Sequence, residues 1–151
     1  MPQPASGLRH KPPFATPEAA EAAFYAAFAA TDLGIMAGVW DDGEDTLCIH
    51  PGGGLLQGRA AVMQSWMEIF SGARPPTIEI EPVTTLVSGD VAVHVRTESI
   101  RPNGQPAEQA SRVLATNVFR RSGGSWYLVV HQASLPLRVR PARGAGDHRI
   151  H

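Results

Sequence analysis

Apolar residues in the first part of the chain recur at the spacing of an α-helix. Ala20, Phe24, Ala27 and Phe28 fall on one face when the segment is wound as a helix. Thr16 precedes them, and its hydroxyl can accept a hydrogen bond from a backbone N–H of the first turn. The pattern therefore predicts a helix that begins just after Thr16.

Two later segments show the same periodicity. Leu33, Met36 and Trp40 form an apolar stripe behind Asp32, a residue type that caps helices. Apolar residues also recur on one face from about residue 59 to residue 70. We therefore predict a short second helix and a longer third one.

The second half of the chain alternates between polar and apolar residues, which is typical of strands. Strands are predicted at 46–50, 77–81, 91–96, 109–121 and 126–134. Gly and Pro clusters separate several of these segments and favour turns. Three helices followed by hairpin-linked strands indicate an α+β fold with an antiparallel sheet.

The length of 151 residues suits one domain. We place a single α+β domain at residues 16–136. Residues 1–15 contain four prolines within the first thirteen positions, and residues 137–151 mix Arg, Pro and Gly without a period. We expect both of these end segments to be flexible.

The charge balance argues against nucleic-acid and membrane partners. Thirteen basic and fourteen acidic side chains nearly cancel, so no domain-wide field would attract nucleic acid or an anionic membrane. The Ala-rich run at 19–30 is too short to span a bilayer, and the first fifteen residues lack the apolar stretch of a secretory signal. The single Cys48 suits a reducing compartment. We expect a cytoplasmic protein.

The sequence carries no signature of a cofactor. Glycines 52–54 follow a predicted strand, but no Lys-Ser or Lys-Thr pair comes after them, so they indicate a turn rather than a phosphate loop. Two histidines could approach a metal ion, yet no carboxylate lies at ligand spacing. We therefore expect neither a cofactor nor a metal.

Four short motifs, in this order, resemble one known family. They are Trp40-Asp41-Asp42, the corner His50-Pro51-Gly52-Gly53, the strand Thr116-Asn117-Val118-Phe119-Arg120 and the closing segment Trp126 to Ser134. Over about residues 16–136 the chain resembles the SnoaL-like, ketosteroid-isomerase-like family of the nuclear transport factor 2-like superfamily. The resemblance implies a cystatin-like α+β barrel, in which a cone-shaped, curved antiparallel sheet wraps around N-terminal helices. It also implies a deep pocket and a homodimer formed through the sheet.

His50 is the first catalytic candidate. It ends a short predicted strand on the same face as Cys48, and an imidazole exchanges protons near neutral pH. The resemblance places His50 where steroid isomerases carry their aspartate base. The alternative interpretation is a histidine that caps the turn before Pro51.

Asn117 is the second catalytic candidate. It lies in mid-strand among apolar neighbours, where an amide needs hydrogen-bond partners. The resemblance matches it to a protonated aspartate of the isomerases, so its amide would stabilise a developing oxyanion. The alternative is that it bonds a neighbouring loop backbone. The oxyanion-binding tyrosine of the isomerases matches Phe24, with Tyr25 one residue out of phase.

The remaining pocket candidates are aromatic or polar residues: Trp40, Trp66, Phe24, Phe28, His131 and Ser134. Each tryptophan can be either a core residue or a pocket wall. Alternation sets His131 and Ser134 on opposite faces of the last strand without showing which face is inner. If the His131 face is the inner one, His50 and His131 could meet across the pocket.

Four charged residues have structural interpretations. Arg59 begins the third helix, where a cation is unfavourable for the helix dipole, so we predict a carboxylate partner at Asp41 or Asp42. The glutamates of the strands are interpreted as solvent-facing: Glu79, Glu81 and Glu98.

Two functional hypotheses remain. The first is a small-molecule-binding protein of the SnoaL-like kind, a cofactor-independent isomerase, cyclase or dehydratase that uses acid–base chemistry on a small apolar or carbonyl-containing ligand. The second is a non-catalytic dimeric association or ligand-sensing module, as in the calmodulin-dependent kinase association domain. An enzyme should place His50 beside a water-accessible cavity, whereas an association module should present a large apolar sheet face.

Overall fold

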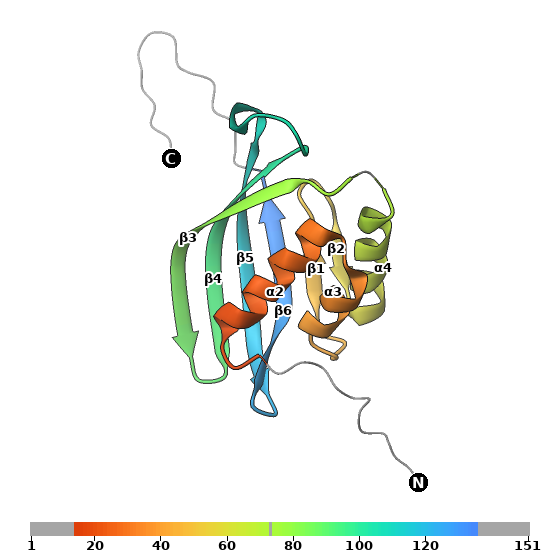
Figure 1. Cartoon of the computed structure of the whole chain (residues 1–151). Helices are drawn as coiled ribbons and strands as arrows, with labels where there is room; N and C mark the ends of the chain where they lie inside the picture. The colour runs from red at the N-terminus through yellow and green to blue at the C-terminus, as the bar shows by residue number, and fades with distance from the viewer. Residues whose placement is uncertain (1–13, 73, 136–151) are drawn as a thin grey trace, which may run out of the picture.

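The computed structural model describes residues 14–72 and 74–135. The described chain forms three α-helices, one 3₁₀ turn and one six-stranded curved sheet (Figure 1). The helical elements are α2 (Pro17–Ala30), α3 (Leu33–Val39), α4 (Arg59–Phe70) and η1 (Ala107–Gln109). The strands are β1 (Leu47–Ile49), β2 (Leu55–Gln57), β3 (Thr77–Ser88), β4 (Val91–Arg101), β5 (Ser111–Ser122) and β6 (Ser125–Ser134).

The helices begin and end where local chemistry predicts. The Thr16 side chain accepts a hydrogen bond from the backbone N–H of Ala19, at 3.0 Å, and so caps α2. Helix α2 ends at Thr31, whose φ of 51° is left-handed. Asp32 then caps α3 by accepting from the N–H of Ile35, also at 3.0 Å. The three predicted helices are confirmed.

The strands form one sheet in the order β2-β1-β6-β5-β4-β3. Strands β3 to β6 pair antiparallel, as do β1 and β2, but β1 runs parallel to β6. The curved α+β sheet is thus confirmed, with the difference that it is mixed and does not close into a barrel. Alternation within a strand carries no information about the direction of a partner so distant in the chain, so the sequence could not reveal this parallel pair.

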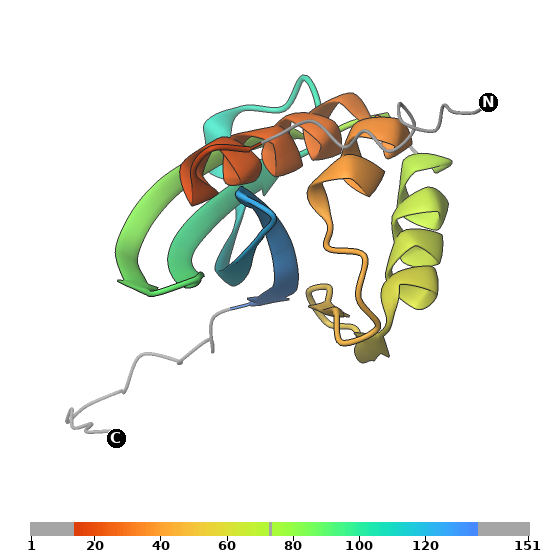
Figure 2. The ribbon, with the colours of Figure 1, turned by 90° about the horizontal axis from the view of Figure 1, so that it is seen from below.

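Helix α2 lies across the concave face of the sheet, and α3 and α4 flank the β1–β2 side (Figures 1 and 2). Register places Ala92, Phe119 and Leu128 on this inner face, where all three are fully buried. The opposite, outer face has no covering helix in the described chain. Its alternate residues point away from α2.

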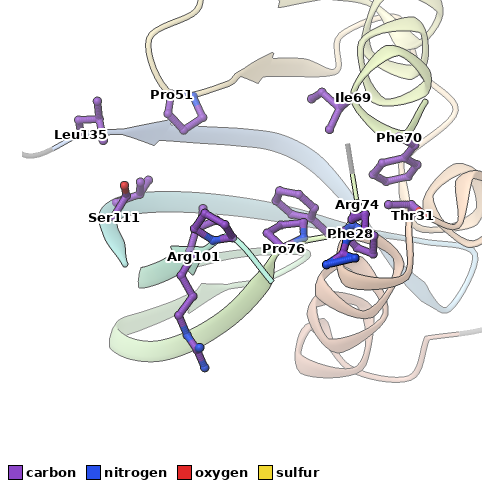
Figure 3. Close-up of a pocket in the computed structure, with 14 residues that line it drawn as sticks. Phe28, Thr31, Pro51, Ile69, Phe70, Arg74, Pro76, Arg101, Ser111 and Leu135 are labelled. Atoms are coloured by element: carbon purple, nitrogen blue, oxygen red, sulfur yellow. The ribbon is translucent and has the colours of Figure 1, made fainter. Parts of the chain in front are cut away.

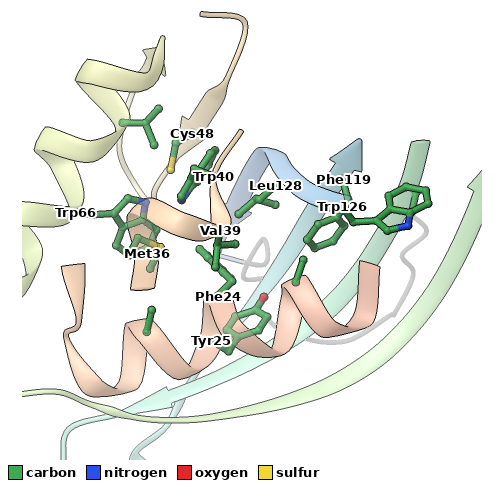
Figure 4. Packing of buried hydrophobic residues seen from close by; sticks show 14 residues of the cluster. Phe24, Tyr25, Met36, Val39, Trp40, Cys48, Trp66, Phe119, Trp126 and Leu128 are labelled. Atoms are coloured by element: carbon green, nitrogen blue, oxygen red, sulfur yellow. The ribbon is translucent and has the colours of Figure 1, made fainter. Parts of the chain in front are cut away.

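Phe24 of α2 is at the centre of the hydrophobic core (Figure 4). Its ring makes edge-on contacts with Trp40 and Trp66, at centroid distances of 6.5 and 5.6 Å. All three side chains are fully buried, so they anchor α2, α3 and α4 to one another. None of the helices described is long and apolar enough to cross a membrane.

Candidate functional site

A cavity of about 540 Å³ opens at one end of the sheet, between the C-terminal ends of α2 and α4 (Figure 3). The strand ends of β4, β5 and β6 complete its wall. Its lining residues are Phe28, Thr31, Pro51, Ile69, Phe70, Arg74, Pro75, Pro76, Ile100, Arg101, Pro102, Ser111, Val113 and Leu135.

The cavity wall is mostly apolar, with few polar groups. The guanidinium of Arg101 already donates to the backbone carbonyl of Gln105 and lies 3.9 Å from Glu79. Arg74 has no hydrogen bond or ion pair among the described residues, and Ser111 adds one hydroxyl. Apolar walls with a few polar groups are typical of sites for small organic ligands.

A buried polar network lies beneath α2. The Tyr25 hydroxyl donates to Glu98 Oε2 at 2.6 Å. Asn117 Nδ2 donates to the Tyr25 oxygen at 3.0 Å and to Glu21 Oε2 at 2.9 Å. Burial raises the pKa of Glu98, and the negative charge of Glu21 adds to this effect. The protonated, neutral form of Glu98 therefore persists to higher pH than that of an ordinary carboxyl group.

One charge in this network is balanced by a cation. Arg96 Nε donates to Glu21 Oε1 at 2.9 Å, with both side chains largely buried. His94, which is fully buried, places Nδ1 only 3.0 Å from the same oxygen, but neither of its ring nitrogens is aligned for a hydrogen bond. The Arg96 guanidinium thus pairs with the Glu21 carboxylate inside the protein.

The network also fixes the protonation of His131. Its Nδ1 atom lies 2.6 Å from Asn117 Oδ1. Because Asn117 Oδ1 can only accept, Nδ1 of His131 carries the proton, and Nε2 keeps its lone pair. Burial, with a smaller effect of His50, lowers the pKa of His131 to about 3. His131 is therefore a neutral hydrogen-bond acceptor at physiological pH.

His50 is held by helix α4. Ser65 donates its hydroxyl proton to the carbonyl of Val62 at 2.7 Å, so its oxygen accepts from His50 Nε2 at 2.9 Å. The imidazole packs edge-on against Trp66 at 4.7 Å. Burial lowers the pKa of His50, which favours the neutral ring with a lone pair on Nδ1.

A family model described as the SnoaL-like domain matches residues 18–138. The chain belongs to the SnoaL-like family. Solved structures of the nuclear transport factor 2-like kind share its fold, one of them from Pseudomonas putida KT2440 with a TM-score of 0.72, 18% identity, and coverage of 88% of this chain and 93% of that one. The family and the fold expected from the sequence motifs are confirmed.

Three proteins that are similar to this SnoaL-like chain carry different names. It is 37% identical, with a TM-score of 0.79 over 83% of this chain and 99% of the other, to a protein from Thiobacillus denitrificans ATCC 25259 that is named as a calcium/calmodulin-dependent protein kinase type II association domain. It is 33% identical, with a TM-score of 0.71 over 79% and 92%, to a Streptomyces avermitilis protein named as a dehydratase. The F-box protein SKIP8 of Arabidopsis thaliana is 30% identical over 105 residues, which make up 70% of this chain but only 43% of that relative.

The structure brings few of the predicted site residues to the cavity of this SnoaL-like protein. Phe28 lines it, whereas Trp40, Trp66 and Phe24 are fully buried in the core. Ser134 is exposed at the end of β6. Both tryptophans therefore belong to the hydrophobic core cluster.

His50, Asn117 and His131 do not line the cavity either. His131 does face inward, but Trp66 packs against both it and His50, at ring distances of 6.2 and 4.7 Å. Both N–H bonds of Asn117 are already used, by Glu21 and Tyr25, so it has no free donor for an oxyanion in this arrangement. The Asn117 amide thus bonds side chains of the network and not a neighbouring loop backbone, which was one of the two alternatives considered for it.

Sequence reasoning missed four members of the buried network: Glu21, Tyr25, Arg96 and Glu98. Glu98 is 1% exposed, so its interpretation as a solvent-facing residue is wrong. Tyr25, judged out of phase, directs its hydroxyl into the network. The sequence does contain a signal for this network. Glu21, Tyr25 and Phe28 recur at helical spacing, and three polar residues alternate at positions 94, 96 and 98.

Proposed function

We propose that this SnoaL-like protein binds a small apolar molecule with a carbonyl or other polar end in the cavity at the open end of its sheet. The observation that carries the proposal is the largely apolar cavity of about 540 Å³, with Thr31, Arg74, Arg101 and Ser111 as its polar side chains. A volume of this size suits a small organic ligand.

Acid–base chemistry on that ligand is the catalytic part of the proposal. His50 is the favoured base, because its Nε2 donates to Ser65 and its Nδ1 carries the lone pair, with the weakly donating Cys48 thiol 3.9 Å from that atom. Its neighbour Pro51 forms part of the cavity wall. The similarity to a protein named as a dehydratase supports this chemistry.

Binding can be tested with β-tetralone, an apolar ketone, and methyl NMR. Methyl signals of Ile69, Ile100 and Val113 should shift on titration, because all three line the cavity, while Leu86 on the outer sheet face should not respond. The variant Val113→Trp should fill the cavity and abolish the shifts. Shifts confined to the outer face, or none at all, would contradict binding in the cavity.

Catalysis can be tested with the same ketone in D₂O. The protein should accelerate exchange of the acidic C–H protons beside the carbonyl, and His50→Gln should remove the acceleration while β-tetralone still binds. Equal exchange rates in the wild type and the variant would assign the protein a binding role without His50 catalysis.

A second candidate function is association through the outer face of the sheet. Leu86, Val91 and Leu114 point outward from neighbouring strands and are 63%, 40% and 45% exposed. Val93 and Val118 lie between Leu86 and Leu114 on the same face, and apolar groups exposed on one face favour a protein interface. The similarity to a protein named as a kinase association domain supports a homodimer of this kind.

Sedimentation measurements test the dimer. The wild type should sediment as a dimer, and Leu114→Glu should shift it to monomer because a charge would be buried at the interface. Leu55→Glu is the matched control, since Leu55 is 59% exposed on the distant edge strand β2. A monomeric wild type would eliminate this second function.

A further inference from the structure

The indole N–H of Trp66 is an unpaired donor inside the protein. Trp66 is fully buried, and its Nε1 has no hydrogen-bond partner among the described residues. Leaving such a group unpaired costs about 1–3 kcal/mol. Buried donors of this kind in folded proteins generally bond an ordered water or a ligand.

An unpaired acceptor lies close to this donor. The ring of His131 is 6.2 Å from the ring of Trp66, and His131 is only 2% exposed. Its Nδ1–H is bound to Asn117, and its Nε2 lone pair has no partner in the part of the chain that the structure describes. The Arg96–Glu21 ion pair orients the Asn117 amide, and through it the imidazole.

The donor and the acceptor pack against the same apolar side chain. Phe24 packs against both rings, at 4.9 Å from His131 and 5.6 Å from Trp66. A hydroxyl oxygen can accept from an indole N–H and donate to an imidazole nitrogen at once, whereas a carbonyl oxygen can only accept and an ammonium can only donate. An apolar ring that carries one hydroxyl therefore matches this pair.

The cavity adjoins this buried pair through two shared aromatic residues. Phe28 and Phe70 line the cavity and also contact Trp66, at ring distances of 5.2 and 5.6 Å. These two rings separate the cavity from the buried pair. Rotation of two aromatic side chains occurs without a change of fold, so they can act as a partition that a ligand passes.

We propose that Trp66 Nε1–H and His131 Nε2 form a second, deeper subsite that binds the hydroxyl group of a phenol-like ligand. This subsite rests on the proposed function, because the ligand reaches it through the cavity. Trp66 and His131 would recognise a hydroxyl group, and no polar residue of the cavity wall is as deeply buried as these two.

Phenol and toluene are suitable probes, because they have nearly the same shape and differ by hydroxyl against methyl. A purely apolar site would favour toluene, whereas two added hydrogen bonds should make phenol bind about tenfold more tightly. In the wild type, phenol should shift the indole N–H proton signal of Trp66, and toluene should not. A stronger affinity for toluene, or an unmoved indole signal at saturation with phenol, would overturn the subsite.

Trp66→Phe supplies the complementary variant. It keeps an aromatic ring but removes the N–H, so the preference for phenol should fall about tenfold while toluene still binds. Trp126→Phe is the control, because Trp126 packs instead beneath Arg121, and it should keep the preference. An unchanged phenol-to-toluene ratio in Trp66→Phe would overturn the proposal. If β-tetralone shifts the cavity methyls but neither small probe binds, the subsite fails and the proposed function stands. If neither β-tetralone nor phenol binds, both proposals fail.

Discussion

Tyr25 and Glu98 lie 73 residues apart in the chain, yet the hydroxyl of one donates to the carboxyl of the other at 2.6 Å beneath helix α2. The bond ties the middle of α2 to the centre of strand β4. Burial raises the pKa of both groups, most strongly through loss of hydration. The pair is therefore a titratable element in the interior, where its protonation state affects stability.

Glu98→Gln should stabilise the protein increasingly as the pH rises. The folded state holds the Glu98 proton above the ordinary pKa of 4.5, so the stability that the protonated group contributes is full below pH 4.5 and is lost as the pH rises through its folded pKa. Glutamine keeps an acceptor for Tyr25 but carries no charge.

Urea unfolding from pH 4 to pH 8 measures this effect. The difference in unfolding free energy between Glu98→Gln and the wild type should grow by up to ~1.4 kcal/mol for each unit by which the folded pKa exceeds the ordinary one. A constant difference across the range would show that Glu98 titrates normally in the folded protein.

His131→Gln should reduce acid sensitivity. The folded pKa of His131 lies near 3, below its ordinary value of 6.5, so the stability from the neutral ring is full above pH 6.5 and is lost as the pH falls toward 3. Between pH 7 and pH 5, thermal unfolding should show a larger loss of stability in the wild type than in the variant. Glu98 contributes equally in both proteins, so its contribution cancels in the comparison. Equal losses of stability in the two proteins between pH 7 and pH 5 would contradict the lowered pKa of His131.

The helices and most strands could be predicted because their signals are local. Thr16 and Asp32 cap the helices that follow them, and alternation marks the long strands. The parallel partner of β1 could not be predicted, because strand direction depends on how β2, α4 and the strands β3 to β5 return the chain to β6.

The site was harder to predict than the fold, because both faces of β4 offer a plausible interior. Val93 and Val95 alternate with His94 and Arg96, and hydrophobicity alone favours the valines for the inner face. The structure turns the histidine and arginine inward, where Glu21 from α2 compensates Arg96. The alternation of residues within β4 carries no information about a compensating charge as distant in the chain as Glu21.

Cys48 should be unreactive in the folded protein. It is fully buried, and burial raises the pKa of its thiol to about 12, so almost no thiolate is present at pH 8. Because it is the one cysteine in the sequence, labelling reports on this site alone. Iodoacetamide should label the native protein far more slowly than the urea-unfolded protein, and equal rates would show that β1 opens readily.

Arg59→Ala should destabilise the protein by about 2–3 kcal/mol. A carboxylate partner was expected for Arg59, and Asp42 is present at 3.6 Å, but its guanidinium chiefly donates to backbone carbonyls at the end of α3. It bonds those of Ala37 at 2.8 Å, Trp40 at 3.0 Å and Asp41 at 3.1 Å. Charged donors to the last carbonyls of a helix satisfy groups that otherwise lack partners, and hydrogen bonds to charged groups are worth about 1.5–3 kcal/mol.

The matched control for this change is Arg112→Ala. Arg112 forms an ion pair with Glu81 at 3.6 Å in which both side chains are more than half exposed, and such pairs contribute below about 1 kcal/mol. Arg59→Lys should recover part of the loss, because an ammonium keeps the charge but cannot reach several carbonyls as a planar guanidinium does. Equal midpoints of urea unfolding for Arg59→Ala and Arg112→Ala would mean that α3 holds its place without the arginine, and that Trp40 alone anchors the end of that helix.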